Sequence, residues 1–185
     1  MDSLLNEQLL TTTVHISMRK LSKTKNIDGL ISHELKDRIE GLCGKEGYII
    51  KGSIFVVQRS IGKVITINSE SNIQYEITYK LKSILPCKGD IYHCIIDSIS
   101  KMGLIAYLDF TDEGTDEGTD GTDGTEVTLK NSPLLIIIPN EYLQVDKTIE
   151  DYEINKKIIV SVLDSRIKYQ ASQIQVIGKV VDTID

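Results

Sequence analysis

The sequence predicts an α+β protein of two domains, spanning residues 1–86 and 87–185. Two patterns lead to this prediction. In the first domain one stretch has the helical period, and β-branched residues dominate on either side of it. In the second domain helical periodicity is nearly absent, and short β-rich runs follow one another. We therefore expect one helix packed on an antiparallel sheet, followed by an all-β domain.

The first domain is expected to start with a strand over residues 11–18, which are rich in threonine and other β-branched residues. A helix follows, because apolar residues recur at intervals of three and four and so share one helical face. Asp28 is the expected N-cap, and Gly44 the expected stop after the last apolar position. The residues on this apolar face are Ile27, Ile31, Leu35, Ile39 and Leu42.

Three strands are expected after the helix. The first covers residues 48–57 with a bend at Gly52, and the second covers residues 61–67. The third has the clearest alternation of apolar and polar residues in the chain, which is typical of a strand with one buried and one solvated face. Pro86 closes the domain. The apolar positions of the third strand are Tyr75, Ile77, Tyr79 and Leu81.

The second domain contains five β-rich runs, separated by turn signals or by an acidic segment. Short strands in this number favour a small closed barrel, and the five-stranded OB-fold is the leading candidate. Closure would also remove the exposed edges of the sheet, which are prone to aggregation in a chain rich in isoleucine. The runs cover residues 91–102, 104–110, 134–138, 156–163 and 174–181.

The formal net charge of −6 comes from one segment. Residues 109–126 contain eight acidic and no basic side chains, so the rest of the chain carries 21 basic and 19 acidic residues. Their Gly-rich, Asp-rich repeats cannot form a packed core, and residues 111–126 are therefore expected to be a disordered, solvated insert of the second domain. The repeats fail the EF-hand pattern, because Gly118 and Val127 stand where calcium ligands are needed.

The sequence carries no catalytic motif. It contains no nucleotide-binding glycine loop, nucleophile elbow, metalloprotease helix or Cys-x-x-Cys pair. His93 lies beside Cys94, but no further ligands follow at zinc spacing. We therefore expect no enzyme activity, no cofactor and no metal. The three cysteines suit a reducing, intracellular compartment as small apolar side chains, and no apolar run is long enough to span a membrane.

Binding is the chemistry that the second domain could perform. OB barrels hold single strands by stacking bases on aromatic rings and by pairing phosphates with Lys and Arg. The alternative is that the basic and aromatic residues are ordinary solvated positions at strand ends, which would supply only a modest phosphate interaction. The candidate RNA-binding residues are Tyr92, Lys101, Tyr107, Arg166, Lys168 and Tyr169.

Five stretches, taken in order, are similar to a known protein family. Residues 35–50 combine a helix with a Gly-x-x-Gly-Tyr turn, and four further stretches match a domain junction, a barrel hairpin with Lys-Met-Gly, and the last two barrel strands. With these features the chain resembles the stalk subunit of multisubunit RNA polymerases, a family that comprises the seventh subunit of eukaryotic polymerase II and its archaeal counterpart. The four further stretches are residues 85–90, 98–105, 160–166 and 174–178.

The resemblance implies a tip domain that docks on the polymerase core and an OB barrel of the ribosomal-protein S-one type that faces nascent RNA. It implies as partners the RNA polymerase core subunits, a stalk partner similar to the fourth subunit, and weakly bound single-stranded RNA. The protein would act in the nucleus or, if it comes from a large DNA virus, in the virion or viral factory. The core-docking residues would be Gly44, Lys45, Gly47 and Tyr48, and Lys101, Arg166 and Lys168 would lie near RNA.

Two features depart from the family pattern. Leu104 and Ile105 stand where the first barrel hairpin has an aromatic residue, and the acidic insert has no counterpart. The leading hypothesis is a non-catalytic stalk subunit of a DNA-dependent RNA polymerase. The alternatives are a free-standing OB-fold protein that binds single-stranded RNA in translation or RNA turnover, and an enzyme that uses the insert as a divalent-metal site.

Overall fold

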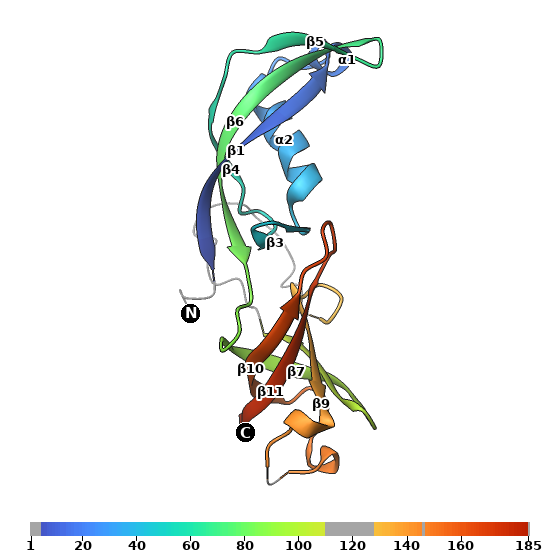
Figure 1. The fold of residues 1–185 in the computed structure, drawn as a ribbon. Helices are drawn as coiled ribbons and strands as arrows, with labels where there is room; N and C mark the ends of the chain where they lie inside the picture. Colours follow the sequence, from blue (N-terminus) through green and yellow to red (C-terminus); the bar gives the residue numbers. More distant parts are fainter. Residues whose placement is uncertain (1–4, 110–127, 146, 185) are drawn as a thin grey trace, which may run out of the picture. The chain divides into compact units, whose positions relative to one another are not determined.

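The chain divides into two compact units, residues 1–85 and residues 86–185. Strands dominate both units, which are described separately below (Figure 1). The predicted acidic insert at residues 111–126 lies outside the described residues. The computed structural model describes residues 5–109, 128–145 and 147–184.

One long strand, β6 (Glu70–Ile84), organises the sheet of the first unit (Figure 1). Strand β1 (Asn6–Ser17) runs antiparallel along one edge of β6. Along the other edge β6 pairs in turn with β5, β4 and β3, and β3 also pairs with β2, all antiparallel. The single strand β6 therefore sets the register of most of the sheet. The four short strands are β2 (Cys43–Gly44), β3 (Gly47–Ile49), β4 (Phe55–Arg59) and β5 (Lys63–Ile67).

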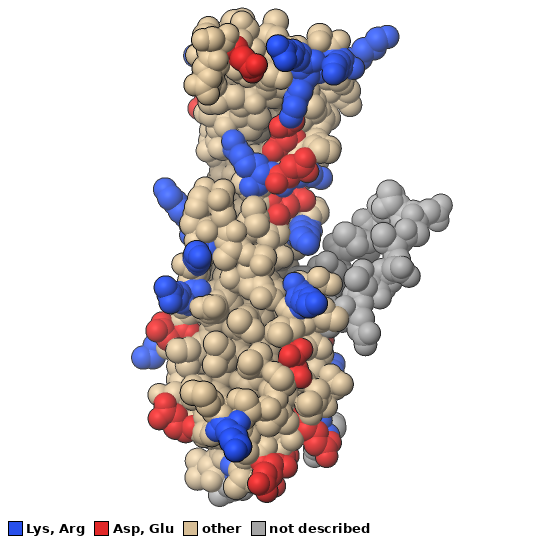
Figure 2. Space-filling model, turned by 90° about the vertical axis from the view of Figure 1, so that its right-hand side faces the viewer, with Lys and Arg blue, Asp and Glu red and all other residues tan. Residues whose placement is uncertain are grey.

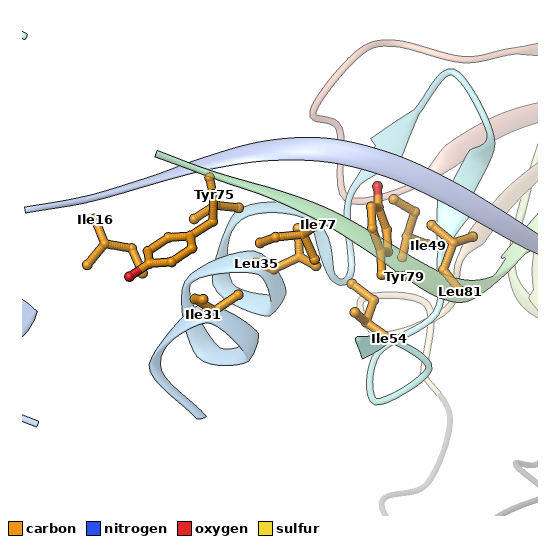
Figure 3. Close-up of a cluster of buried hydrophobic side chains, with 10 residues drawn as sticks. Ile16, Ile31, Leu35, Ile49, Ile54, Tyr75, Ile77, Tyr79 and Leu81 are labelled. Carbon is orange, nitrogen blue, oxygen red and sulfur yellow. The ribbon is translucent and has the colours of Figure 1, made fainter. Parts of the chain in front are cut away.

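The alternation predicted for the third strand is confirmed in β6. Its apolar residues are buried, whereas Glu76, Lys80 and Lys82 between them are exposed. This apolar face meets helix α2 (Ile27–Ile39), which buries Ile31 and Leu35 against it (Figure 3). The buried β6 residues are Tyr75, Ile77, Tyr79 and Leu81.

Helix α2 begins and ends earlier than the apolar spacing predicts. Its N-cap is Asn26, whose side-chain oxygen accepts a hydrogen bond from the backbone N–H of Gly29 at 2.9 Å. Asp28 is therefore not the cap but lies in the first turn. The helix ends at Ile39, because Glu40 is extended and Gly41 adopts a φ of +71°. Leu42 matches the helical period by sequence but lies outside the helix.

The strand predicted over residues 48–57 is two strands, β3 and β4. Between them the chain turns at Gly52, which has a φ of +76°. The hydroxyl of Ser53 donates to the carbonyl of Ile50 at 2.7 Å and stabilises this turn. Lys51, Gly52 and Ser53 interrupt the apolar residues at this point, which the sequence analysis interpreted as a bend within one strand. A short helix, α1 (Met18–Leu21), follows β1. The sequence analysis did not predict this helix.

The second unit contains the closed five-stranded barrel that the sequence predicts. The order around the barrel is β10–β11–β9–β8–β7, and pairing of β7 with β10 closes it. Neighbouring strands are antiparallel except β9 and β11, which are parallel. The strands are β7 (Ile91–Ser100), β8 (Gly103–Leu108), β9 (Leu134–Pro139), β10 (Lys157–Arg166) and β11 (Ile174–Ile184).

Alternate residues of the barrel strands fill its interior, including Ile136 and Ile138 of β9 and Val160 of β10. One buried hydroxyl, that of Ser132, joins two strands. It accepts from the backbone N–H of Leu108 and donates to the carbonyl of Leu134, both at 3.1 Å. The N–H of Leu108 and the carbonyl of Leu134 are buried away from water, so the serine hydroxyl supplies each of them with a hydrogen-bond partner.

The three cysteines form no disulfide. Cys43 and Cys94 are buried, as expected for small apolar side chains, and burial raises the pKa of both thiols. Cys87 is exposed, contrary to that expectation, in the turn that precedes β7. Among the residues described, none of the helices is long and apolar enough to cross a membrane.

Candidate nucleic-acid interface

Two of the six predicted RNA-binding residues cannot stack a base, because their rings are buried. Tyr92 is 3% exposed and Tyr107 is 8% exposed. The hydroxyl of Tyr92 donates to the Asp90 carboxylate at 3.2 Å, and burial together with this carboxylate raises the pKa of Tyr92. Tyr92 points into the barrel with Cys94 and Ile96, whereas Tyr107 shares the outer face of β8 with Ile105 and is buried there. The burial of both rings corrects the sequence prediction.

Three of the remaining candidates lie together on the β10–β11 hairpin. Arg166 is the last residue of β10, and Lys168 and Tyr169 follow in the turn. All three are exposed, and Tyr169 is 72% exposed. The backbone N–H of Ala171 donates to the carbonyl of Lys168 at 3.0 Å and closes the turn. Within the part of the chain that the structure describes, neither Arg166 nor Lys168 forms an ion pair, so both cations are available to an anion.

Lys101 lies at the opposite end of the barrel, in the turn between β7 and β8. The turn is tied to β9 by the side-chain amide of Asn140, which donates to the carbonyl of Lys101 at 2.6 Å. The register places this turn beside Pro139, at the end of β9, whereas β11 begins beside Leu134, at its start. The length of β9 corresponds to about 17 Å at about 3.3 Å per residue. The structure therefore does not bring Lys101 together with Arg166.

The outer surface between the two ends is aliphatic. Ile105 of β8, Ile137 of β9 and Ile177 of β11 are paired across the three strands and form one row. Ile137 and Ile177 are exposed, and Ile105 is partly exposed. An aliphatic row lacks the ring faces on which bases stack. Among the predicted residues, Tyr169 on the β10–β11 hairpin is therefore the one whose ring could stack a base.

The turn that carries Lys130 is bonded to the base of the β10–β11 hairpin, although the sequence analysis did not include this lysine. The side-chain amide of Gln173, at the foot of the β10–β11 hairpin, donates to the carbonyls of Leu129 and Ser132, the latter at 3.0 Å. These bonds hold the exposed Lys130 turn against the hairpin. No sequence signal pointed to this lysine, because more than thirty residues separate it from Arg166 and an acidic segment precedes it.

The charge of the barrel is mixed rather than strongly basic. Lys157 pairs with Asp109 at 2.6 Å and Lys156 pairs with Glu153 at 3.5 Å, so two further cations are compensated. Figure 2 shows one face of the molecule, on which Lys and Arg are interspersed with Asp and Glu. Because few Lys and Arg side chains are free of ion pairs, the barrel would neutralise few phosphates and release few counterions. Any binding of RNA would then be weak and sensitive to salt.

The predicted core-docking residues form the β2–β3 hairpin. Gly44 pairs with Gly47 and Cys43 pairs with Tyr48. Gly47 and Tyr48 are buried, Gly44 is partly buried, and Lys45 is exposed at the turn. Of the four predicted residues, Lys45 is thus the one that presents a long side chain to solvent.

The described residues contain no group of three or more His, Cys, Asp or Glu side chains that could hold a metal ion. His93 and Cys94 are neighbours on β7, but His93 is exposed and Cys94 is buried. Adjacent residues of a strand point to opposite faces, so these two side chains cannot converge on one ion. No model of a known protein family matches the chain, and no curated protein matches it at a significant level.

Replacing Tyr169 with alanine is expected to weaken binding of a labelled oligouridine RNA about tenfold, because stacking contributes about 1–3 kcal/mol per base. Fluorescence anisotropy at low salt would measure the change. The matched control is Tyr92→Phe, which should leave RNA affinity unaltered because this ring is buried. Equal affinities of Tyr169→Ala and the unmodified protein would remove the hairpin from the interface.

Proposed function

We propose that this protein is a non-catalytic subunit of a DNA-dependent RNA polymerase, which docks on the polymerase core through its first unit and offers its barrel to nascent RNA. The observation that carries the proposal is the order of the two units. A helix-bearing sheet is followed, at the Pro86 junction, by a closed five-stranded barrel. A closed five-stranded barrel is compatible with an OB-fold. Of the stretches that resemble the stalk family, residues 35–50 lie in the first unit, and the other four lie in the barrel and at the junction.

The distribution of binding groups supports an accessory role. The barrel has one exposed aromatic ring at the hairpin, two buried tyrosines and few uncompensated cations. Such a surface binds RNA weakly by itself. A subunit anchored on a polymerase needs only weak contacts, because anchoring raises the effective concentration of the emerging RNA.

The competing function is a free-standing OB-fold protein that binds single-stranded RNA in translation or RNA turnover. That function requires strong independent binding, which normally comes from several stacking rings and a basic groove. The aliphatic row of Ile105, Ile137 and Ile177 and the burial of Tyr92 and Tyr107 disfavour it.

Affinity purification of the tagged protein from its native source tests the proposal. We expect the two large polymerase subunits to copurify with it under mild salt. The source material would be the nucleus of the cell or a viral factory. A photocrosslinking residue in place of the exposed Lys45 should then link to a core subunit, whereas the same residue in place of Lys156, on the barrel, should not. Recovery with ribosomes or RNA-decay factors, and without large polymerase subunits, would favour the competing function.

A further inference from the structure

A groove of about 510 Å³ runs along the first unit between α2 and β4. One wall is formed by α2 from Asp28 to Lys36, and the other by consecutive residues 54–59. Two buried residues of the lining, Ile31 and Ile54, belong to the core cluster of Figure 3. The volume lies within the range of about 300–1,000 Å³ that is usual for ligand-binding clefts.

The strand wall of the groove is an edge of the sheet. Within the described residues β4 pairs only with β6, so one row of its backbone N–H and C=O groups has no strand partner. The opposite edge strand, β1, is covered in part, because Arg38 of α2 donates to the carbonyl of Thr13 and the hydroxyl of Thr12, both at 3.3 Å. No side chain among the described residues bonds to the backbone of residues 55–59, and the Asp28 carboxylate bonds to the side chain of Arg59. An uncovered edge strand is a template for an added strand.

Charged groups define the two ends of the groove. The Asp28 carboxylate and the Arg59 guanidinium form an ion pair that closes one end. Lys36 lies eight residues further along α2, which is about 12 Å at about 1.5 Å per residue. Its side chain is partly buried and forms no ion pair or hydrogen bond with any described residue. The groove is therefore about four residues of extended chain long, with an uncompensated cation at its open end.

Large apolar side chains flank the free edge. Phe55 is 68% exposed and Val57 is 50% exposed, and Val57 lies at a register shift of β4. Exposed apolar side chains beside unpaired backbone groups are the features that strand-adding domains use, since the backbone supplies affinity and side-chain pockets supply specificity.

We propose that this groove binds an extended peptide segment of a partner protein, which adds as a strand to the free edge of β4. The peptide alternates apolar residues, which contact Phe55 on the face of β4 that points away from α2, with an acidic residue on the α2 side, which pairs with Lys36. The binding site is distinct from the β2–β3 hairpin and from the barrel, and it does not depend on the function proposed above.

A random heptapeptide library displayed on phage, selected against the full chain, tests the proposal. We expect enriched sequences in which an acidic residue lies among alternating apolar residues. A synthetic copy of the most enriched peptide should slow amide hydrogen exchange in residues 55–59 and leave that of β1 unaltered. Lys36→Glu should weaken its binding about fivefold, as expected for loss of one partly exposed ion pair, and a peptide with lysine in place of its acidic residue should then bind better.

Lys63→Glu is the matched control, because Lys63 is an exposed lysine of the same sheet outside the groove. It should bind the peptide as the unmodified protein does. Absence of enriched peptides, or protection elsewhere than β4, would overturn the proposal. Concentration-dependent dimerisation of the chain alone, with protection of β4 in the dimer, would instead assign the edge to a second copy and also overturn it. All these measurements use the isolated chain. A negative result would therefore reject the peptide site without bearing on whether the protein copurifies with a polymerase.

Discussion

Gly103→Ala is expected to lower the free energy of unfolding of the barrel by about 3 kcal/mol, as backbone strain and a steric clash combine. Gly103 begins β8 with a φ of +144°, and a Cβ atom there would lie 2.1 Å from the carbonyl oxygen of Ile138. That carbonyl belongs to the neighbouring strand β9, so it cannot move aside without shifting the barrel. Urea unfolding, with amide hydrogen exchange of β9 and β6 followed separately, would locate the loss in the second unit.

Gly89→Ala is the matched control in the same unit. Gly89 also has a positive φ, of +95°, but no atom lies within 4 Å of the position its Cβ would take. Its replacement should therefore cost only the backbone strain of about 1 kcal/mol. If the two variants lost equal stability, the close approach of β8 to β9 would not be the cause.

Leu35→Ala is expected to lower the free energy of unfolding of the first unit by about 3 kcal/mol, because it removes a large side chain from a packed interior and leaves a cavity. Leu35 is 0% exposed and packs with Ile31 against the apolar face of β6. The same loosening of α2 would open one wall of the α2–β4 groove, so peptide binding should fall together with stability.

Leu9→Ala provides the comparison for the same chemical change on the same sheet. Leu9 lies on β1 and is 60% exposed, so its truncation should alter the free energy of unfolding by less than about 1 kcal/mol. Thermal denaturation of both variants measures the difference. A Leu9→Ala loss as large as that of Leu35→Ala would contradict the assignment of α2 as the cover of the core.

Local pattern predicted the elements of this protein better than their ends. The alternation of Tyr75, Ile77 and Tyr79 identified β6 and its buried face, because side-chain direction in a strand follows directly from sequence position. The predicted start of α2 differs from the observed one because neighbouring polar residues compete for the N-cap position. Asn26 takes this position in place of Asp28. The break between β3 and β4 was predicted only as a bend, since a glycine such as Gly52 can mark either a bend within a strand or a turn that ends it.

The candidate RNA site was predicted less well for a different reason. Tyr92 and Tyr107 are aromatic residues in strands of a barrel, and the sequence did not show that both rings are buried. The turn that carries Lys130 lies beside the β10–β11 hairpin because β9 and β11 run parallel and Gln173 bonds to the turn before β9. Such a neighbourhood depends on strand pairing between distant segments, which composition does not encode.

The amino-acid sequence by itself determined the division into two parts, the closed five-stranded barrel and the buried face of β6, because these depend on periodicity and on runs of apolar residues. Tertiary structure alone decided which aromatic rings are exposed, that Lys101 and Arg166 lie at opposite ends of β9, and that α2 and the free edge of β4 enclose a groove. The physical reason is that burial and proximity arise from the pairing of segments far apart in the chain, whereas periodicity is a property of each segment alone.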